Sequence, residues 1–382
     1  MAKAGVIGSG SWGTALARVL SKNGHEVTLW SRREEESRML REERENKSKL
    51  PGVKLPDDIL CTTDLEQTVE GKDILVLATA SPSIRSMAKK MAPYVAAGQL
   101  IVDVSKGIEE STLMILTDVI AQEIPQCRAA VLSGPSHAEE VGRDIPTTVV
   151  AGAKDRETAE YIQNLFMNKV FRVYTSPDML GIELGGALKN VIALAAGAAD
   201  GLGCGDNTKA ALITRGIVEM SRLGVAMGGH IETFNGLTGI GDLIVTCASM
   251  HSGNRRAGIL IGQGKTMQEA MDEVQMVVEG VYSARAARIL AEKYGIDMPI
   301  VNEVNKVLFE NKTAREAMAD LMLRDKNIRN FHGKSNEKNI IFVTIFVEYI
   351  IMVTSGAEMY PRRRTSRWRE LLKDLVILCQ QT

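Results

Sequence analysis

A turn built around three glycines constrains this chain more strongly than any other feature of its sequence. Gly8, Gly10 and Gly13 follow the apolar residues 4–7 and lead into a helical pattern over residues 15–20. In that setting the first glycine makes a tight turn, the second lets a pyrophosphate approach the backbone, and the third lets the helix pack closely on the strand. The phosphate charge then lies at the helix N-terminus. The sequence therefore predicts a dinucleotide-binding turn, with a purely structural glycine turn as the alternative.

Short apolar runs alternate with helical patterns through the N-terminal part of the chain. The predicted strands cover residues 4–7, 26–30, 73–77, 100–104, 129–132 and 147–150, and a helical pattern over 83–91 lies among them. Strands that alternate with crossover helices form a mostly parallel sheet that is covered on both faces. We therefore predict an α/β, Rossmann-type N-terminal domain that binds NAD(P) and covers residues 1–178.

The pattern changes after about Pro177. Apolar residues recur at helical spacing over residues 188–199, and further helices are predicted over 210–227, 266–273, 281–293 and 314–323. We expect an all-α domain over residues 179–330 that holds the substrate and the catalytic groups. Residues 331–382 join an apolar stretch to a basic one and are expected to be an atypical, poorly ordered extension, with contact to a membrane surface as the alternative.

Composition excludes several functional classes. Lys+Arg 46 against Asp+Glu 47 gives no overall positive charge that would favour nucleic acid. No apolar run reaches the roughly 18 residues of a membrane span, and no secretory leader precedes the glycine turn. Five cysteines without a CxxC pair favour reduced thiols and argue against a zinc site. We expect a cytoplasmic protein with no metal, no nucleic-acid partner and no integral membrane association.

The end of the second predicted strand bears on cofactor preference. An acidic residue there would hold a ribose hydroxyl group and favour NAD, but this chain has Arg32 and Arg33 after Ser31. Paired guanidinium groups suit a 2′-phosphate, so we expect NADP(H), with NAD(H) kept as a second cofactor. In the alternative, both arginines only begin the charged surface run that continues to Glu45.

Ligands of open α/β sheets gather where the strands end. Lys106 follows the strand over 100–104 and could meet a phosphate, although a surface lysine in a turn is the simpler alternative. Gly134 and Ser136 follow the strand over 129–132, where glycine allows close backbone approach and the serine hydroxyl can donate a hydrogen bond. These residues are predicted to form one edge of the ligand site.

Lys189 is the most informative single residue of the chain. It is the only charged side chain between Leu184 and Ala199, and Gly185 and Gly186 lie near it. A buried ammonium group must find a partner or lose its proton, and a lysine with a lowered pKa is a competent general base. We expect such a base, with a ligand in the room that the glycines leave. The alternative is a lysine that extends to the helix surface.

Two later segments add polar groups. Asp242 stands between glycines and an apolar run, where it could orient Lys189, accept a substrate hydroxyl or simply cap a helix. The segment 251–256 combines Ser252 and Asn254 with two arginines, which fits a phosphate pocket as well as it fits a basic loop. His251 is not expected to be a catalytic base, because no neighbouring group would orient it.

Six segments, taken together and in this order, closely resemble the NAD(P)-dependent glycerol-3-phosphate dehydrogenase family of prokaryotic type over about residues 2–328. They are GSGSWGTALA from Gly8, VSKGIE from Val104, SGPSHAEEV from Ser133, GGALKNVIALAAG from Gly185, GIGDLIVTC from Gly239 and VVEGVYSA from Val277. The resemblance implies an oxidoreductase that interconverts sn-glycerol 3-phosphate and dihydroxyacetone phosphate. It also implies a role in supplying glycerol 3-phosphate for glycerophospholipid synthesis.

The resemblance also implies the site residues. Cofactor contacts fall on Gly8, Gly10, Ser11, Trp12, Gly13, Arg32, Arg33, Lys106, Ala138, Gly253, Val277 and Glu279. Contacts to a small phosphorylated substrate fall on Lys106, Gly134, Ser136, Lys189, Asp242, Ser252, Gly253 and Asn254. Lys189 matches the proton acceptor of the family, and we expect a homodimer.

The chain departs from the family pattern at Gly253, where the family has an arginine that would contact substrate phosphate and cofactor. Losing one charge-assisted contact could cost about 1.5–3 kcal/mol, and Arg255 or Arg256 could compensate only if it reaches the same place. Two alternatives therefore stay open. One is a related NAD(P)-dependent hydroxy-acid dehydrogenase, and the other is a non-catalytic NADPH-binding protein.

Overall fold

The computed structural model describes residues 1–324 and contains one eight-stranded sheet in the order β3-β2-β1-β4-β5-β6-β7-β8. Its strands are β1 (Lys3–Ile7), β2 (Glu26–Trp30), β3 (Leu60–Thr62), β4 (Ile74–Leu77), β5 (Leu100–Asp103), β6 (Arg128–Ser133), β7 (Thr147–Gly152) and β8 (Phe171–Ser176). All neighbouring strands are parallel except β6 and β7. The predicted α/β fold class is confirmed.

Two strands, β3 and β8, were not predicted from the sequence. β3 has only three residues, which is too short to show a pattern. β8 alternates buried and exposed residues at the sheet edge, with Phe171 and Val173 buried and Arg172 and Tyr174 exposed, so it lacks the continuous apolar run of the inner strands.

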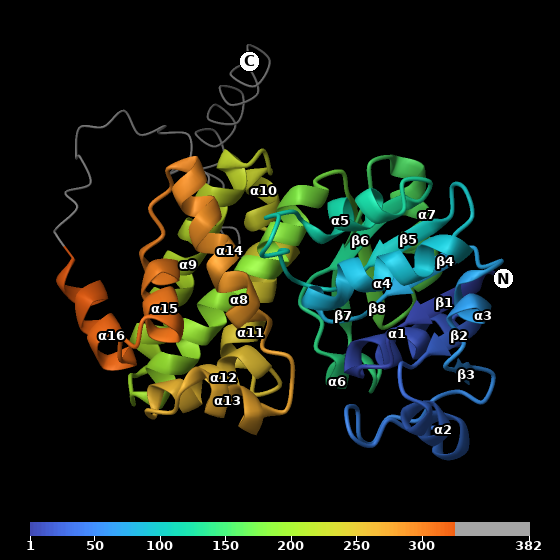
Figure 1. Cartoon of the computed structure of the whole chain (residues 1–382), viewed down its shortest axis with the longest axis horizontal. Helices are drawn as coiled ribbons and strands as arrows, with labels where there is room; N and C mark the ends of the chain where they lie inside the picture. The colour runs from blue at the N-terminus through green and yellow to red at the C-terminus, as the bar shows by residue number, and fades with distance from the viewer. Residues whose placement is uncertain (325–382) are drawn as a thin grey trace, which may run out of the picture. The chain divides into compact units, whose positions relative to one another are not determined.

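The helices of this part cover both faces of the sheet (Figure 1). They are α1 (Ser11–Lys22), α2 (Glu34–Glu43), α3 (Leu65–Val69), α4 (Ile84–Met91), α5 (Leu116–Glu123), α6 (Ala138–Val141) and α7 (Arg156–Phe166), with 3₁₀ turns η1 (Ser81–Ser83) and η2 (Ala92–Tyr94). Successive strand residues pack on opposite faces. Val76, for example, belongs to the core beside Leu16, whereas Leu77 belongs to the core beside Met87.

The glycine turn adopts the geometry that its sequence predicts. Gly8 has φ +116°, which favours glycine, and a Cβ atom on Gly13 would lie 1.9 Å from the carbonyl oxygen of Gly8. A Cβ atom on Gly10 would meet nothing within 4 Å. The turn joins β1, the strand on which the chain order of the sheet reverses, to the N-terminus of α1. Such a switch point is where open α/β sheets bind their ligands.

The remainder of the described chain is helical (Figure 1). It comprises α8 (Met179–Gly201), α9 (Asp206–Ala226), α10 (Ile231–Phe234), the π-helical turn η3 (Leu237–Gly241), α11 (Asp242–Ala248), α12 (Gly253–Gly262), α13 (Met267–Val274), α14 (Glu279–Tyr294), α15 (Pro299–Phe309) and α16 (Ala314–Leu323). We retain the proposed domain boundary after residue 178, because the last strand ends at Ser176. The predicted extension over 331–382 lies outside the described residues.

Helix α8 forms the centre of this helical part and packs on α9, α11, α12 and α14. Among residues 1–324 it is the one helix long and apolar enough to cross a membrane, but it is largely buried inside the protein. Glycines bring α8 and α12 unusually close. A Cβ atom on Gly197 would lie 2.1 Å from the carbonyl oxygen of Arg255, and one on Gly258 would lie 2.2 Å from that of Leu194. This packing fixes α12 beside the C-terminal half of α8.

Candidate active site

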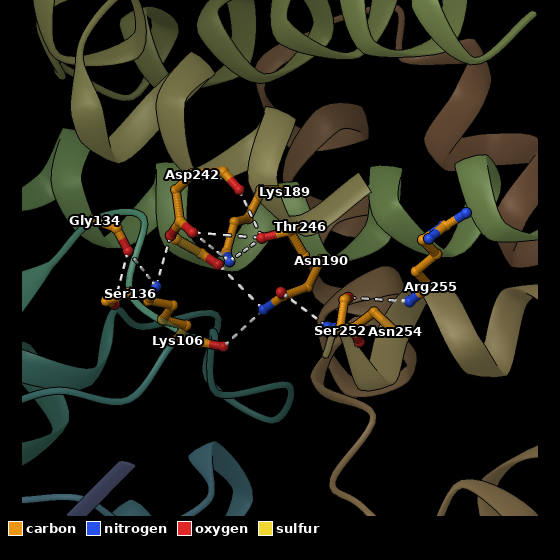
Figure 2. Close-up of polar contacts among 11 residues, drawn as sticks. Lys106, Gly134, Ser136, Lys189, Asn190, Asp242, Thr246, Ser252, Asn254 and Arg255 are labelled. Carbon is orange, nitrogen blue, oxygen red and sulfur yellow. Dashed lines mark hydrogen bonds and ion pairs between the residues drawn. The ribbon is translucent and has the colours of Figure 1, made fainter. Parts of the chain in front are cut away.

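Lys189 and Asp242 are buried and form a charge cluster with the partly buried Lys106 (Figure 2). Lys189 Nζ donates to Asp242 Oδ1 at 2.7 Å, and Lys106 Nζ donates to Asp242 Oδ2 at 2.6 Å. The lysines come from α8 and from the loop after β5, so one carboxylate joins the helical part to the sheet. Lys189 is 5% exposed and Asp242 1%, which excludes the alternative of a lysine that extends to the surface.

The local fold places Asp242 over Lys189. Asp242 is the first residue of α11 and Gly241 occupies the capping position, so the carboxylate does not cap the helix. The preceding π-helical turn η3 approaches α8 closely, because a Cβ atom on Gly185 would lie 2.4 Å from the carbonyl oxygen of Thr238. Gly185 therefore admits a segment of the chain itself and leaves no room there for a ligand. Gly186 likewise faces the Lys106 side chain, with its virtual Cβ 3.3 Å from Lys106 Cγ.

The cluster has the electrostatics of a proton-transfer site. Burial lowers the pKa of Lys189 to about 8, the charge of Lys106 acts in the same direction, and the charge of Asp242 opposes both. Burial raises the pKa of Asp242, but the two ammonium groups outweigh this effect and hold it below its ordinary value. At neutral pH the carboxylate is ionised, and the Lys189 amine can gain or lose its proton close to physiological pH.

Two residues that the sequence analysis missed complete the surroundings of Lys189. Thr246 lies one turn after Asp242 on α11, and its hydroxyl accepts from Lys189 Nζ at 2.6 Å. The same hydroxyl donates to the backbone carbonyl of Asp242 at 2.6 Å. His137, the residue before α6, is partly buried, and desolvation followed by the charges of Lys189 and Lys106 lowers its pKa to about 4. The spacing from Asp242 to Thr246 could have indicated Thr246, and the position between the expected site residues Ser136 and Ala138 could have indicated His137.

The two strand-end segments meet as expected. Lys106 Nζ donates to the carbonyl oxygen of Gly134 at 2.8 Å, and the Ser136 hydroxyl donates to the same oxygen at 2.9 Å (Figure 2). Gly134 has φ +145°, a backbone conformation that only glycine adopts without strain. This conformation places the Gly134 carbonyl group beside Lys106. Lys106, Gly134 and Ser136 thus form one wall of the candidate site.

The segment 251–256 is a helix start and not a basic loop. Ser252 caps α12 by accepting from the backbone N–H of Arg255 at 3.2 Å, and Gly253 and Asn254 form the first turn. The Asn254 side chain is engaged within the protein, because it donates to Asn190 Oδ1 at 2.9 Å and accepts from the backbone N–H of Gly280 at 2.8 Å.

Asn190, which the sequence analysis also missed, extends this network. Its amide donates to the carbonyl oxygen of Lys106 at 3.3 Å and to that of Gly186 at 3.1 Å (Figure 2). A chain of amides therefore links the first turn of α12, helix α8 next to Lys189, and the loop that carries Lys106. Its position directly after Lys189 is the one signal that could have indicated it.

The expected cofactor residues surround the carboxyl ends of the strands. Ser11 and Trp12 begin α1, Arg32 and Arg33 are exposed after β2, and Ala138 is the buried first residue of α6.

Val277 and Glu279 come from the helical part of the described chain. Val277 is exposed and lies two residues before the start of α14. The Glu279 carboxylate, at the start of α14, accepts from the backbone N–H of Ser81 at 3.0 Å and from the Ser81 hydroxyl. It therefore reaches the η1 turn just beyond the end of β4.

Unpaired buried polar atoms support a ligand at this edge. Ser31 Oγ, Thr79 Oγ1, Asp103 Oδ2 and Ser133 Oγ are buried and have no hydrogen-bond partner within the described residues. All four lie at, or within two residues after, the ends of β2, β4, β5 and β6. Together with the open space beside Gly10 and the α1 N-terminus, they fit the dinucleotide expected from the sequence. No cluster of three His, Cys, Asp or Glu side chains suited to a metal occurs in residues 1–324.

Comparisons with known proteins agree with this geometry. Residues 3–159 match the family described as NAD-dependent glycerol-3-phosphate dehydrogenase N-terminus, and residues 178–319 match its C-terminus. A glycerol-3-phosphate dehydrogenase [NAD(P)+] of Agathobacter rectalis is 66% identical over 330 residues, which cover 86% of this chain and 98% of the relative. The chain belongs to this family.

Further relatives agree. A protein of the same description from Fusobacterium nucleatum is 61% identical over 330 residues, covering 86% of this chain and 98% of the relative. The crystal structure of a glycerol-3-phosphate dehydrogenase from Coxiella burnetii has a TM-score of 0.82 at 36% identity, and the match covers 85% of this chain and 99% of that one. The resemblance stated from the sequence is confirmed, and with it the expectation of an NAD(P)-dependent oxidoreductase.

Proposed function

We propose that this chain catalyses the reversible interconversion of sn-glycerol 3-phosphate and dihydroxyacetone phosphate with NADP(H), and with NAD(H) as a second cofactor. The observation that carries the proposal is the buried amine of Lys189. It lies 2.7 Å from Asp242 Oδ1, and its pKa is lowered to about 8, in a chain of the glycerol-3-phosphate dehydrogenase family.

Lys189 is the proposed acid and base. In the oxidative direction the neutral amine accepts the proton of the C2 hydroxyl group, and Asp242 stabilises the ammonium group that forms. In the reductive direction the ammonium group returns this proton to the C2 oxygen. Bound NADP(H) or NAD(H) supplies the complementary chemistry by giving or taking the hydride at C2. Thr246 keeps the amine in place through its 2.6 Å contact.

The remaining site residues are proposed to hold the substrate. Lys106, a member of the charge cluster, would bring the positive charge that a phosphorylated substrate needs. The other residues proposed to hold the substrate are Gly134, Ser136, Ser252 and Asn254. Because the Asn254 side chain is engaged with Asn190 and Gly280, its proposed role is to hold the first turn of α12 in place. The backbone N–H groups of that turn that have no partner within the helix would then be available to a bound phosphate.

The cofactor is proposed to lie along the strand ends. Gly8, Gly10 and Gly13 with Ser11 and Trp12 would hold the pyrophosphate at the α1 N-terminus. Arg32 and Arg33 would pair with a 2′-phosphate, which favours NADP(H). Ala138, Val277 and Glu279 would contact the rest of the dinucleotide.

In the cell, the proposed product of reduction is glycerol 3-phosphate for glycerophospholipid synthesis. The cytoplasmic location and the homodimer expected from the sequence stay predictions.

The proposal is tested with purified protein, NADPH and dihydroxyacetone phosphate. We expect the reduced cofactor to be consumed and glycerol 3-phosphate to form. Consumption with a keto acid but not with dihydroxyacetone phosphate would favour the related hydroxy-acid dehydrogenase. Binding of NADPH without consumption of any of these substrates would favour a non-catalytic protein.

A further inference from the structure

The proposed substrate site has no cationic side chain at position 253, because this chain has a glycine there. The inference below rests on the proposed function of that site. Phosphate monoesters carry about −1.5 to −2 charges near neutral pH. The cluster of Lys106, Lys189 and Asp242 offers two ammonium groups, and both are already engaged with the one carboxylate. A further cation on the first turn of α12 would complete the charge balance.

Arg255 does not provide that cation. Its Nε and Nη2 lie 2.9 Å and 2.8 Å from Asp200 Oδ2, and Nη1 donates to the carbonyl oxygen of Ala248 at 2.8 Å. The Asp200 carboxylate is also paired with Lys209. These contacts hold the Arg255 guanidinium group against the C-terminal end of α8, so moving it to a ligand would break a four-group network.

Arg256 is placed differently. It stands three residues after Gly253, so both residues face the same side of α12. Arg256 Nη1 lies 3.7 Å from Met276 Sδ, and a Cβ atom on Gly253 would lie 3.4 Å from Met276 Cβ and 3.7 Å from Met276 Sδ. The Arg256 guanidinium group and the missing side chain of residue 253 therefore border on the same methionine.

The Arg256 guanidinium group is not neutralised by a carboxylate within residues 1–324. The described part of the chain gives it no ion pair, whereas Arg255 has one, and its side chain is only partly exposed. The first turn of α12 is tied to the charge cluster through Asn254 and Asn190. We infer that Arg256 binds a phosphate group in this site and replaces the arginine absent from position 253.

Kinetics of Arg256→Ala, Arg256→Lys and the control Arg315→Ala test this inference. Arg315 is an exposed arginine on α16. We expect Arg256→Ala to raise the KM for dihydroxyacetone phosphate by about tenfold to a hundredfold, as loss of a charge-assisted contact would. Arg256→Lys should fall between this variant and the wild type, and Arg315→Ala should match the wild type. Adding Gly253→Arg to Arg256→Ala should recover most of the loss.

Two binding measurements, with NADPH and with inorganic phosphate, complement the kinetics and identify which phosphate group Arg256 contacts. If the ligand is the substrate phosphate, NADPH should bind Arg256→Ala as it binds the wild type, whereas weaker NADPH binding with an unchanged KM would assign the contact to a cofactor phosphate. Inorganic phosphate should raise the melting temperature of the wild type and of Arg315→Ala, but not that of Arg256→Ala.

The outcomes separate this inference from the proposed function. A wild type that consumes no NADPH with dihydroxyacetone phosphate refutes the proposed function, while the phosphate-dependent melting temperatures still judge Arg256. Arg256 is the wrong residue if Arg256→Ala keeps the wild-type KM and NADPH affinity. It is equally wrong if inorganic phosphate stabilises Arg256→Ala as much as the wild type, or stabilises neither.

Discussion

Lys189 and Asp242 lie 53 residues apart in the sequence, yet their charged groups meet at 2.7 Å inside the protein. Burial alone would drive the lysine towards its neutral form, and the carboxylate limits that effect. The pair thus keeps a proton exchangeable near neutral pH, which is the property that the proposed reaction needs in both directions.

The pKa of Lys189 predicts opposite pH profiles for the two directions. Oxidation of glycerol 3-phosphate needs the neutral amine, so its rate should rise as the pH increases through about 8. Reduction of dihydroxyacetone phosphate needs the ammonium group, so its rate should fall over the same range. Initial rates between mildly acidic and mildly alkaline pH would show this, and two profiles that change in the same sense would contradict it.

Replacing Asp242 with asparagine should shift these profiles. The Asp242 charge raises the pKa of Lys189, so its removal should lower that pKa below about 8. The rise of the oxidation rate should therefore move to lower pH, together with a loss of maximal rate from poorer positioning. Measuring the midpoint of each profile separates the two effects, and a midpoint at higher pH would be inconsistent with the pairing.

Gly10→Ala and Gly13→Ala form a matched pair of variants. A Cβ atom on Gly13 would lie 1.9 Å from backbone oxygen, so this variant should lose about 1–3 kcal/mol of stability, as overpacked sites do. A Cβ atom on Gly10 meets nothing within 4 Å, so this variant should melt close to the wild type but bind NADPH more weakly. Melting temperature and NADPH titration give both quantities. Equal NADPH affinity of Gly10→Ala and the wild type would refute the phosphate role of the turn.

The double variant Arg32→Ala/Arg33→Ala tests cofactor preference. Both side chains are exposed after β2, so their loss should leave stability unchanged. The KM for NADPH should rise by about tenfold or more, as loss of charge-assisted contacts would, and the KM for NADH should change little. Arg38→Ala, an exposed arginine on α2, serves as the control. An equal effect on both cofactors would show that these arginines do not distinguish the 2′-phosphate.

Gly253→Arg should change substrate affinity little in the wild type, because Arg256 is inferred to supply the phosphate contact already. A Cβ atom at position 253 makes only ordinary contacts of 3.4 Å or more, so the longer side chain can be accommodated and the melting temperature should stay unchanged. Kinetics of Gly253→Arg beside Gly253→Ala separate the effect of charge from that of helix propensity. A large fall in the KM for dihydroxyacetone phosphate in Gly253→Arg, but not in Gly253→Ala, would show that Arg256 does not supply this contact in the natural chain.

The sequence predicted the elements that carry strong local patterns. The inner strands and the glycine turn were recognisable because continuous apolar runs and glycine spacing are local properties. β3 and β8 were missed because a three-residue strand and an alternating edge strand carry weak patterns.

The candidate site was predictable as a set of residues but not as an arrangement. The isolation of Lys189 in an apolar run indicated burial, and Asp242 was one of its possible partners. Three other features depend on tertiary packing: the contacts of Asn190, the lowered pKa of His137, and the separation of Arg255 from Arg256. The close approach of α8 and α12 produces the last of these, and no local pattern encodes it.

The role of Lys189 is tested most directly by the turnover of Lys189→Met in both directions, with NADPH binding measured on the same preparation. Loss of the proton acceptor should lower kcat by about a hundredfold to ten-thousandfold while NADPH still binds. Lys169→Met, an exposed lysine before β8, should retain wild-type kcat. Wild-type turnover by Lys189→Met would contradict the proposed role of this amine.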